Sequence, residues 1–263
     1  MDGQAIDKTK SAAASLQASV SPAEWDTRVQ LAAAFRIAHA LGWNDGVTNH
    51  ITARIPGEPD HFVICPQGLG WDEMTASSLI KADVDGRVLS QSELSPGPAG
   101  LNFHSAILKA LPNIACTMHI HPMAGVVISS LKKGLMILDQ RGCILHNEVA
   151  YHDFEGYARA KDEAPRIVAE LGPRRTMIMR NHGLLAIGRT IGEMFYFMGK
   201  LIAACELQER VMATGGEINP IPEAVIQVAN KQSIERYRDR PYGNLDFKML
   251  TRRLARVDSS FMQ

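Results

Sequence analysis

Three histidines lie at the ends of short apolar segments that are typical of buried strands. His119 and His121 end an apolar run that begins at Ile114. Side chains two residues apart on a strand point to the same side, so these two imidazoles are expected to project together. His182 follows a second apolar run, 176–179, and precedes a glycine. Three imidazoles that converge in this way can hold a divalent metal with open positions for a substrate.

A His-x-His pair by itself is a weak signal, because such histidines are often surface residues or hydrogen-bonded core residues. A third histidine at the end of another strand strengthens the prediction of a metal site. Three neutral imidazoles suit zinc first, with iron, manganese or cobalt as alternatives. We therefore expect His119, His121 and His182 to be metal ligands.

The segments that must position these histidines alternate between helical and extended patterns. Ser21 begins a capping box with a proline at the first helical position, which predicts a helix that ends near Leu41. Further helices are expected at 103–111, 123–130, 157–171 and 191–213, and strands at 51–55, 62–65, 80–84, 114–121, 135–138, 143–146 and on both sides of 181–183. The Pro/Gly-rich stretch 95–100 is expected to be a loop. This order predicts one α/β domain over 21–263, after a small polar tail at 1–20 that we expect to be disordered.

The composition excludes several kinds of partner. The chain has 263 residues with 28 basic and 28 acidic side chains, so its formal net charge is zero. We therefore expect no nucleic-acid binding, and no run of apolar residues is long enough for a membrane span. The four cysteines are widely spaced, which favours reduced thiols in a cytoplasmic protein over a disulfide framework. A small molecule is the expected partner.

Four stretches taken together resemble the class II aldolase/adducin family. They are Gly46–Arg54, Pro66–Leu79, Met118–Pro122 and Arg180–Gly188, and their order and separations are specific as a set. The resemblance implies a three-layer α/β/α sandwich around a mostly antiparallel sheet. It also implies a cyclic tetramer with active sites at subunit interfaces. It makes His119, His121 and His182 the metal ligands, the same trio that the spacing indicates.

The chain also departs from the sugar-phosphate members of that family. Their catalytic carboxylate lies four residues before a helical histidine, which is His104 here, and that position is Gly100. Two hydroxyl residues that hold phosphate correspond to Pro98 and Ala99. The family's asparagine aligns with His50, and a phosphate-holding threonine with Gln67. Phosphate needs convergent N–H or O–H donors, so a phosphorylated sugar is not the expected substrate.

The remaining chemistry favours cleavage of a carbon–carbon bond. A three-histidine metal can chelate substrate oxygens and withdraw electrons, which serves aldol cleavage, enolisation or decarboxylation. Decarboxylation needs no base for a C–H proton, so the loss of the carboxylate at Gly100 favours a lyase acting on an unphosphorylated hydroxy or oxo acid. An epimerase, an iron-dependent oxygenase and a non-catalytic adducin-like interaction domain remain as alternatives.

Four further residues are candidates for the pocket. His50 is the candidate catalytic residue, either as a proton donor or as a ligand for a substrate carboxylate, against the alternative that it only holds its loop. Gln67, Gly68 and Gly100 are candidate substrate-binding residues, although a turn alone would explain Gly68. His104 faces either the site or the core, and we expect a structural role.

Overall fold

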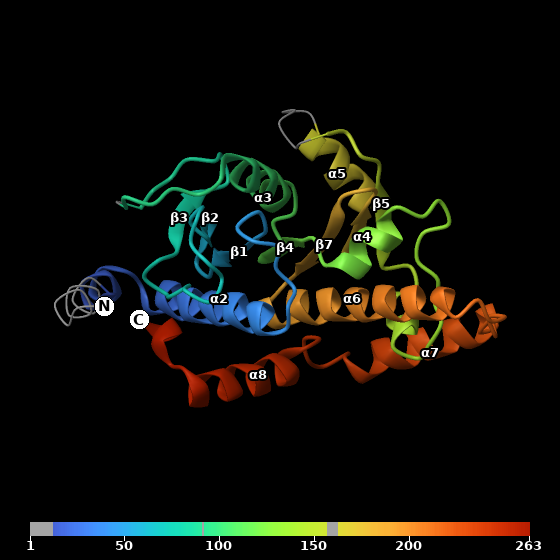
Figure 1. Ribbon diagram of the computed structural model, residues 1–263. Coiled ribbons are helices and arrows are strands. Elements are labelled where there is room, and N and C mark those ends of the chain that lie inside the picture. The colour runs from blue at the N-terminus through green and yellow to red at the C-terminus, as the bar shows by residue number, and fades with distance from the viewer. Residues whose placement is uncertain (1–12, 91, 157–162) are drawn as a thin grey trace.

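Within residues 13–90, 92–156 and 163–263, which the computed structural model describes, seven strands form one sheet with helices on both faces (Figure 1). The strands are β1 (His50–Ile55), β2 (Glu58–Ile64), β3 (Ile80–Asp83), β4 (Cys116–Ile120), β5 (Val149–His152), β6 (Thr176–Met179) and β7 (Gly183–Gly188). Their order across the sheet is β3-β2-β1-β4-β7-β6-β5. The pair β5–β6 is parallel and the other pairs are antiparallel. The mostly antiparallel α/β sandwich expected from the sequence is confirmed.

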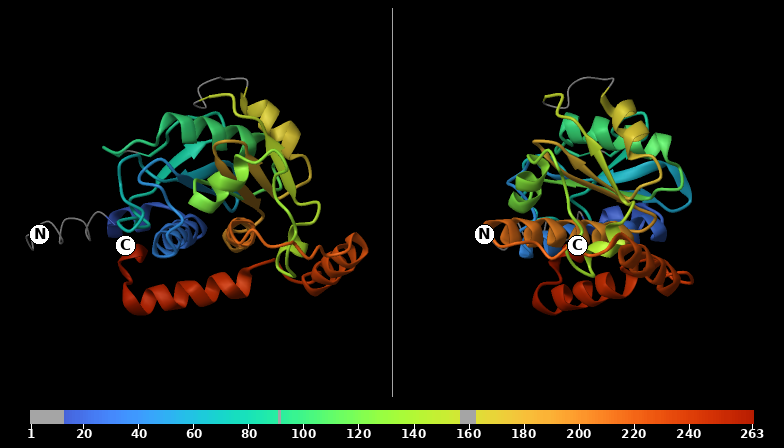
Figure 2. Two further views of the ribbon diagram at one scale, coloured as in Figure 1. Left: turned by 45° about the vertical axis from the view of Figure 1, so that its right-hand side comes forward. Right: turned by 90° about the vertical axis from the view of Figure 1, so that its right-hand side faces the viewer.

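The helices form a layer on each side of this sheet (Figure 2). On one side lie α2 (Pro22–Ala40) and α6 (Ile191–Ala213), with α8 (Asn244–Val257) packed outside them. On the other side lie α3 (Pro98–Ala110) and α5 (Glu163–Leu171). The short helix α4 (Met123–Ser129) packs against α6 and β7, and α7 (Glu223–Arg236) packs against the 3₁₀ helix η1 (Gly142–Leu145). None of the described helices combines the length and the apolar character needed to cross a membrane.

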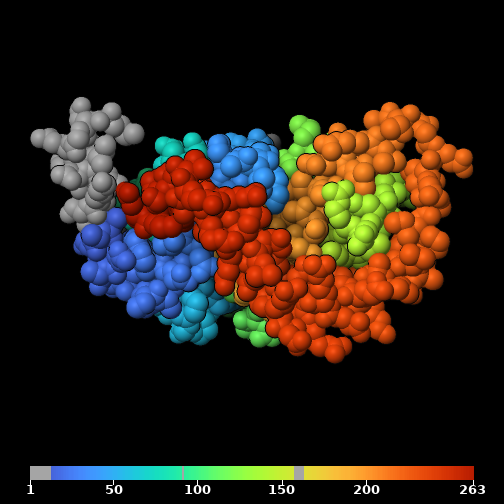
Figure 3. All heavy atoms as spheres, turned by 90° about the horizontal axis from the view of Figure 1, so that it is seen from below, coloured from blue at the N-terminus to red at the C-terminus, as the bar shows by residue number. Residues whose placement is uncertain are grey.

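The C-terminal segment closes the outer face of the α2–α6 layer (Figure 3). After α8 the chain forms the 3₁₀ helix η2 (Ser260–Met262). The backbone N–H of Ala76 donates to Phe261 O at 2.9 Å, and that of Ser77 donates to Gln263 O at 2.9 Å. These bonds attach the chain's end to the loop between β2 and β3.

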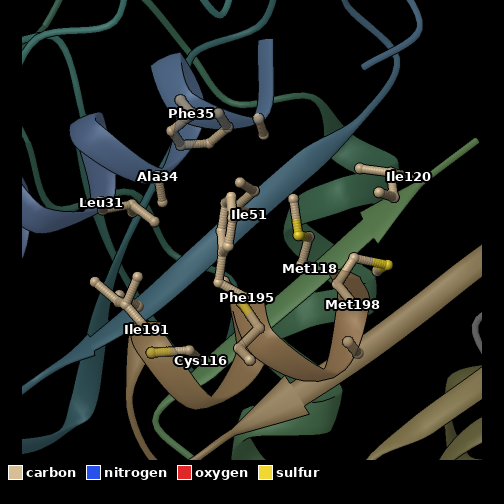
Figure 4. Packing of buried hydrophobic residues seen from close by; sticks show 14 of the residues in the cluster. Leu31, Ala34, Phe35, Ile51, Cys116, Met118, Ile120, Ile191, Phe195 and Met198 are labelled. Atoms are coloured by element: carbon tan, nitrogen blue, oxygen red, sulfur yellow. The ribbon is translucent and has the colours of Figure 1, made fainter. Parts of the chain in front are cut away.

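Strand alternation divides the central strands between two apolar clusters. Ile51 of β1 and Met118 of β4 are completely buried and pack toward α2 and α6 (Figure 4). On the opposite side, Phe103 and Ile107 of α3 pack against residues of β6, β7 and α5. Residues 50, 52, 117 and 119 therefore belong to the α3 side of the sheet, because they alternate with the buried residues of the first cluster.

The helix starts expected from the sequence are confirmed for the two long helices. The Ser21 side chain accepts a hydrogen bond from the backbone N–H of Glu24 at 3.1 Å, and Thr190 accepts from that of Glu193 at 3.0 Å. A side-chain oxygen at this position satisfies an N–H that has no partner within the helix. Both helices carry many buried residues, so they fix the layer beneath β1, β4 and β7.

Helix α3 begins earlier than expected. The predicted loop 95–100 is wrong for its last three residues, because Pro98, Ala99 and Gly100 form the first turn of α3. Pro98 occupies the start of the helix, where proline is tolerated because its missing N–H would have no partner there in any case. Gly100 is consequently held in a buried helical turn rather than in a loop.

Two predicted strands are absent from the described residues, and one strand was missed. Residues 135–138 form no strand, because the N–H groups of Leu135 and Met136 donate to the side chains of Tyr151 and Gln208 instead. Residues 143–146 largely form η1. The neighbouring strand β5 was not expected, since only four residues contribute to it.

The expectations for the N-terminal part of the chain and for the start of α5 can be compared with the structure only in part. Residues 13–19 are helical rather than disordered, in agreement with the helix propensity of their alanines. Residues 1–12 of the expected tail lie outside the described residues. The same is true of 157–162, so α5 is described from Glu163.

Candidate metal centre

Three imidazoles converge at the carboxyl end of β4. The Nε2 atom of His119 lies 2.9 Å from Nε2 of His121 and 3.3 Å from Nε2 of His182. His119 lies within β4, His121 directly follows that strand, and His182 lies in the turn between β6 and β7. Because β7 pairs with β4, this turn lies beside the end of β4. The structure thus brings together the three histidines that were predicted as ligands.

The hydrogen bond of His119 determines which of its nitrogens is free. Its Nδ1 lies 3.0 Å from the carbonyl oxygen of Leu184, which can only accept a hydrogen bond. Nδ1 therefore carries the proton, and Nε2 presents a lone pair toward His121 and His182. A metal-binding histidine is commonly held by such a bond to its other ring nitrogen.

The arrangement fits a divalent metal. In a tetrahedral zinc site with zinc–nitrogen bonds of about 2.0–2.1 Å, any two ligand nitrogens lie about 3.3 Å apart. The 3.3 Å between His119 and His182 matches this spacing, and the 2.9 Å to His121 needs only a small shift. Among the described residues, these three form the group whose ligand atoms could share one ion. No acidic side chain belongs to this group, so the donor set is three neutral imidazoles.

Burial keeps these imidazoles in the neutral form that metal binding needs. Burial first, and then the nearby His121 and His152, lower the pKa of His182 to about 4. The pKa of His119 is held well below its usual value by burial first and then by four neighbouring histidines. Burial also lowers the pKa of His121. Neutral imidazoles present lone pairs to a cation without first losing a proton.

Asp45 lies behind His121. Its Oδ2 atom is 3.9 Å from Nδ1 of His121, on the opposite side of the ring from Nε2. Asp45 is 70% exposed at its side chain. Its backbone N–H donates to Oδ1 of Asn49 at 2.6 Å, which holds the loop before β1 in place. A carboxylate at this position can orient the ring of a metal-binding histidine.

His50 lies between the three histidines and Gly100. It pairs with His119 across β1 and β4, and the two ring centroids are 5.2 Å apart. An ideal Cβ on Gly100 would lie 2.7 Å from Cδ2 of His50, so the ring occupies the space beside the glycine. Burial first, and then the nearby His121 and His182, lower the pKa of His50 to about 3. Its ring is therefore neutral at pH 7.

A buried polar chain continues from His50 into the protein. Nδ1 of His50 lies 2.6 Å from Nε2 of His104, whose side chain is fully buried on α3. Nδ1 of His104 contacts the hydroxyl of Thr52 at 2.8 Å and the hydroxyl of Thr117. The two hydroxyls lie 2.7 Å apart. This chain engages Nδ1 of His50 and leaves only Nε2 for a substrate.

A cavity of about 540 Å³ adjoins this chain. The candidate catalytic residue His50 and the candidate substrate-binding residues Gln67 and Gly100 contribute to its wall. Gly68 does not belong to the described wall; its φ of 89° explains the glycine through a turn. The three converging histidines also lie outside the wall, and His50 connects the cavity to them.

Sequence reasoning missed Asn49 and Asp45. Asn49 contributes to the cavity wall and is 2% exposed, and Asp45 lies beside His121. Both belong to the loop before β1, where polar residues are common and carry no signal of their own. Their proximity to His121 and to the cavity depends on how this loop passes the end of β4.

Comparison with known proteins defines the family of this fold and site. Residues 29–209 match the family described as class II aldolase and adducin N-terminal domain. The chain belongs to this family. The sequence-based resemblance is confirmed, and the match covers both the histidine cluster and His50.

Individual relatives fall into two groups. A provisionally named class 2 aldolase of Pseudomonas aeruginosa is 37% identical over 252 residues, which cover 95% of this chain and 97% of that protein. Alpha-adducin of Rattus norvegicus is 41% identical over 192 residues, which cover 72% of this chain but 26% of the adducin.

Two solved structures resemble the whole fold. The crystal structure of an aldolase II superfamily protein from Pseudomonas syringae has a TM-score of 0.88 and 35% identity, covering 95% of this chain and all of that one. L-fuculose 1-phosphate aldolase from Glaciozyma antarctica has a TM-score of 0.79 and 28% identity, covering 92% of each chain.

Proposed function

We propose that the protein is a metal-dependent carbon–carbon lyase that acts on an unphosphorylated hydroxy or oxo acid. The observation that carries this proposal is the convergence of the Nε2 atoms of His119, His121 and His182. A divalent metal held there, zinc first, would act as a Lewis acid and electron sink toward adjacent substrate oxygens. The proposed reaction is either the cleavage of an aldol bond or a decarboxylation that releases CO2.

His50 is the proposed proton carrier. Its Nδ1 is engaged by His104, so Nε2 is the atom that can reach a substrate. An anionic substrate beside the ring would raise the pKa of His50 from its low value in the free protein, because an opposite charge favours the imidazolium. His50 could then take up a proton with the substrate and return it to carbon after the bond breaks.

Metal analysis tests the site. Protein purified without chelators or added metal should contain close to one divalent ion per chain, measured by plasma mass spectrometry. His119→Ala and His182→Ala should lose the ion. His61→Ala is the matched control, because His61 lies on β2 and pairs with Glu58 away from the cluster. Equal metal content in all four proteins would contradict the proposed site.

Product analysis tests the reaction. The metal-loaded protein is offered a panel of hydroxy and oxo acids, and CO2 and aldehydes are measured. Release of CO2 identifies a decarboxylase, and an aldehyde identifies an aldolase. Aldehyde formed only from phosphorylated sugars would contradict the proposed substrate class. Stereochemical inversion or oxygen consumption without cleavage would instead support an epimerase or an oxygenase.

A non-catalytic interaction domain is the second candidate. The similarity to alpha-adducin, at 41% identity over 192 residues, is the observation that favours it. An interaction domain should keep its protein partner after His119→Ala and turn over no member of the acid panel. A lyase should lose turnover with that substitution.

A tetrameric assembly is also proposed, as the family resemblance implies. In the described chain, Phe154 is 53% exposed although its ring centroid is only 6.2 Å from that of His182. In a tetramer with active sites at subunit interfaces, a second subunit would cover this ring. Light scattering on the purified protein should give four times the 28.8 kDa of one chain. A monomeric mass would contradict the assembly.

A further inference from the structure

Two threonines form a closed hydrogen-bonded group with His104 behind His50. Thr52 of β1 and Thr117 of β4 face each other across the two strands, and both are completely buried. Their hydroxyls lie 2.7 Å apart, and both contact Nδ1 of His104. Neither hydroxyl has a further hydrogen-bond partner among the described residues. The two hydroxyl hydrogens must therefore find their acceptors within this group.

Counting hydrogens decides whether Nδ1 of His104 donates or accepts. If Nδ1 accepts, one hydroxyl donates to it and the second hydroxyl donates to the first, so both hydroxyl hydrogens are bonded. If Nδ1 carries a hydrogen, only one hydroxyl can donate to the other, and one buried hydroxyl hydrogen has no acceptor. An orphaned donor of this kind disfavours the second arrangement by about tenfold or more. Nδ1 of His104 is therefore the acceptor.

The position of the proton on His104 determines its position on His50. Both rings are neutral at pH 7, because burial lowers the pKa of each and the other charges that act on them belong to neighbouring histidines. A neutral His104 whose Nδ1 accepts carries its proton on Nε2, which lies 2.6 Å from Nδ1 of His50. Nδ1 of His50 must then accept, so His50 carries its own proton on Nε2.

Nε2 of His50 is the nitrogen that a substrate can reach. His50 contributes to the wall of the 540 Å³ cavity. Its Nε2 has no hydrogen-bond partner in the part of the chain that the structure describes, and it is not one of the sealed polar atoms there. An ideal Cβ on Gly100 would lie 3.2 Å from this nitrogen, so the glycine leaves space beside it. A protonated Nε2 has no lone pair for a cation, so it cannot be a fourth ligand of the metal site.

We infer that Thr52 and Thr117 are positioning residues that fix the direction of the hydrogen bonds through His104. As a result, His50 presents an N–H donor to a carbonyl, enolate or carboxylate oxygen of the substrate. This inference rests on the proposed function, in which the substrate lies beside the three-histidine site. Breaking a carbon–carbon bond leaves negative charge on such an oxygen, and a fixed donor stabilises that charge more than it stabilises the bound substrate. The proton that returns to carbon would leave from the same Nε2.

The tautomer of His50 can be measured directly. Protein labelled with ¹⁵N-histidine is studied at neutral pH by long-range ¹H–¹⁵N correlation NMR, with and without bound zinc. The ring signals of His50 are identified by their absence from His50→Asn. We expect a hydrogen on Nε2 and a lone pair on Nδ1. A hydrogen on Nδ1 of His50 in the unmodified protein overturns the inference.

Removing one hydroxyl or both tests the role of the threonines. Thr52→Val and Thr117→Val each leave one hydroxyl that can still donate to Nδ1 of His104, so both single variants should keep the tautomer of His50. The double variant has no such donor, and the population of the opposite tautomer should rise about tenfold. The single variants are the matched controls, because valine keeps the shape of threonine. A double variant that keeps the tautomer, or a single variant that loses it, overturns the role of the pair.

Oxalate tests the donor, because it chelates a metal and resembles the enolate of an oxo acid. Isothermal titration of the zinc-loaded protein measures its affinity. His50→Leu removes the donor and should weaken binding about tenfold. His50→Gln keeps an N–H donor in its carboxamide and should bind oxalate within about threefold of the unmodified protein. Equal affinity of His50→Leu and the unmodified protein overturns the donor role.

The outcomes separate this inference from the proposed function. A protein that holds no metal contradicts the proposed function, whereas a hydrogen on Nδ1 of His50 contradicts only the inference. The tautomer can be measured with or without the metal, so the two results are independent. The measurement on the unmodified protein also needs no variant to fold.

Discussion

The imidazole of His50 occupies the space that a side chain on residue 100 would require. An ideal Cβ on Gly100 would lie 2.7 Å from Cδ2 and 2.9 Å from Cγ of His50. The two residues come from β1 and from the first turn of α3. The absent side chain at Gly100 and the imidazole at position 50 therefore depend on each other.

Gly100→Ala is predicted to displace His50. The added methyl group cannot be accommodated without moving a buried ring, and overpacking of this kind costs about 1–3 kcal/mol of unfolding free energy. Turnover should fall at least about tenfold, since small displacements of catalytic groups have large effects on rate. Gly216→Ala is the control, because a Cβ there would meet only the Thr214 hydroxyl at 3.3 Å, outside the described cavity wall. Chemical denaturation and turnover assays measure both effects.

The same contact predicts a coupling between the two positions. Gly100→Glu should be less destabilising in a His50→Asn background than in the unmodified protein, because asparagine is smaller than histidine. A double-mutant cycle measures this interaction free energy, which for residues in contact is about 0.5–3 kcal/mol. Additive effects of the two substitutions would show that the ring and residue 100 do not compete for space.

His104→Phe is predicted to disrupt the polar chain behind His50. His104 is fully buried and contacts His50, Thr52 and Thr117. Its loss leaves buried polar atoms with fewer partners, which costs about 1–3 kcal/mol. His50 also loses the contact that orients its ring, so turnover should fall while metal content stays the same. Loss of the metal together with activity would assign His104 to the metal site instead.

Asp45→Asn is predicted to weaken metal binding without abolishing it. The carboxylate lies 3.9 Å from Nδ1 of His121, and its removal deprives this ring of an anionic neighbour. Substitution of such outer partners lowers metal affinity about 10- to 100-fold. Competition with a chromophoric chelator gives the affinity. Asp26→Asn, on α2 outside the described cluster, should have the affinity of the unmodified protein.

The buried histidines predict that the metal-free protein loses stability in acid. Burial lowers the pKa of His50 from 6.5 to about 3, so between about pH 6 and pH 4 the unfolded chain binds a proton that the folded chain excludes. The unfolding free energy is therefore retained above pH 6.5 and falls as the pH drops toward about 3. One such group contributes a slope on the order of 1 kcal/mol per pH unit.

Urea unfolding of chelator-treated protein at several pH values measures this slope. His50→Gln should reduce it, because the substituted chain has one titrating group fewer. A slope that is the same in the unmodified protein and in His50→Gln would show that His50 is not held neutral by burial.

Local patterns in the sequence were sufficient for much of the fold. The capping box at Ser21 and the apolar spacing within 191–213 predicted α2 and α6, because these signals act within one or two turns of a helix. Strand alternation accounts for the side chains of His119 and His121 projecting to the same side. The expected strand at 143–146 failed, because a short apolar run is compatible with a strand or with a buried 3₁₀ turn.

The sequence alone therefore predicted the α/β class and named His119, His121 and His182 as candidate ligands, because strand alternation and the motifs that resemble the family can be read along the chain. Only the tertiary structure decided that His50 lies against Gly100 and that His104 holds it from behind. Only the tertiary structure placed Asn49 in the wall of the cavity beside His50. These contacts join β1 and its preceding loop to α3, roughly 50 residues apart, and no local pattern records how two such distant segments pack.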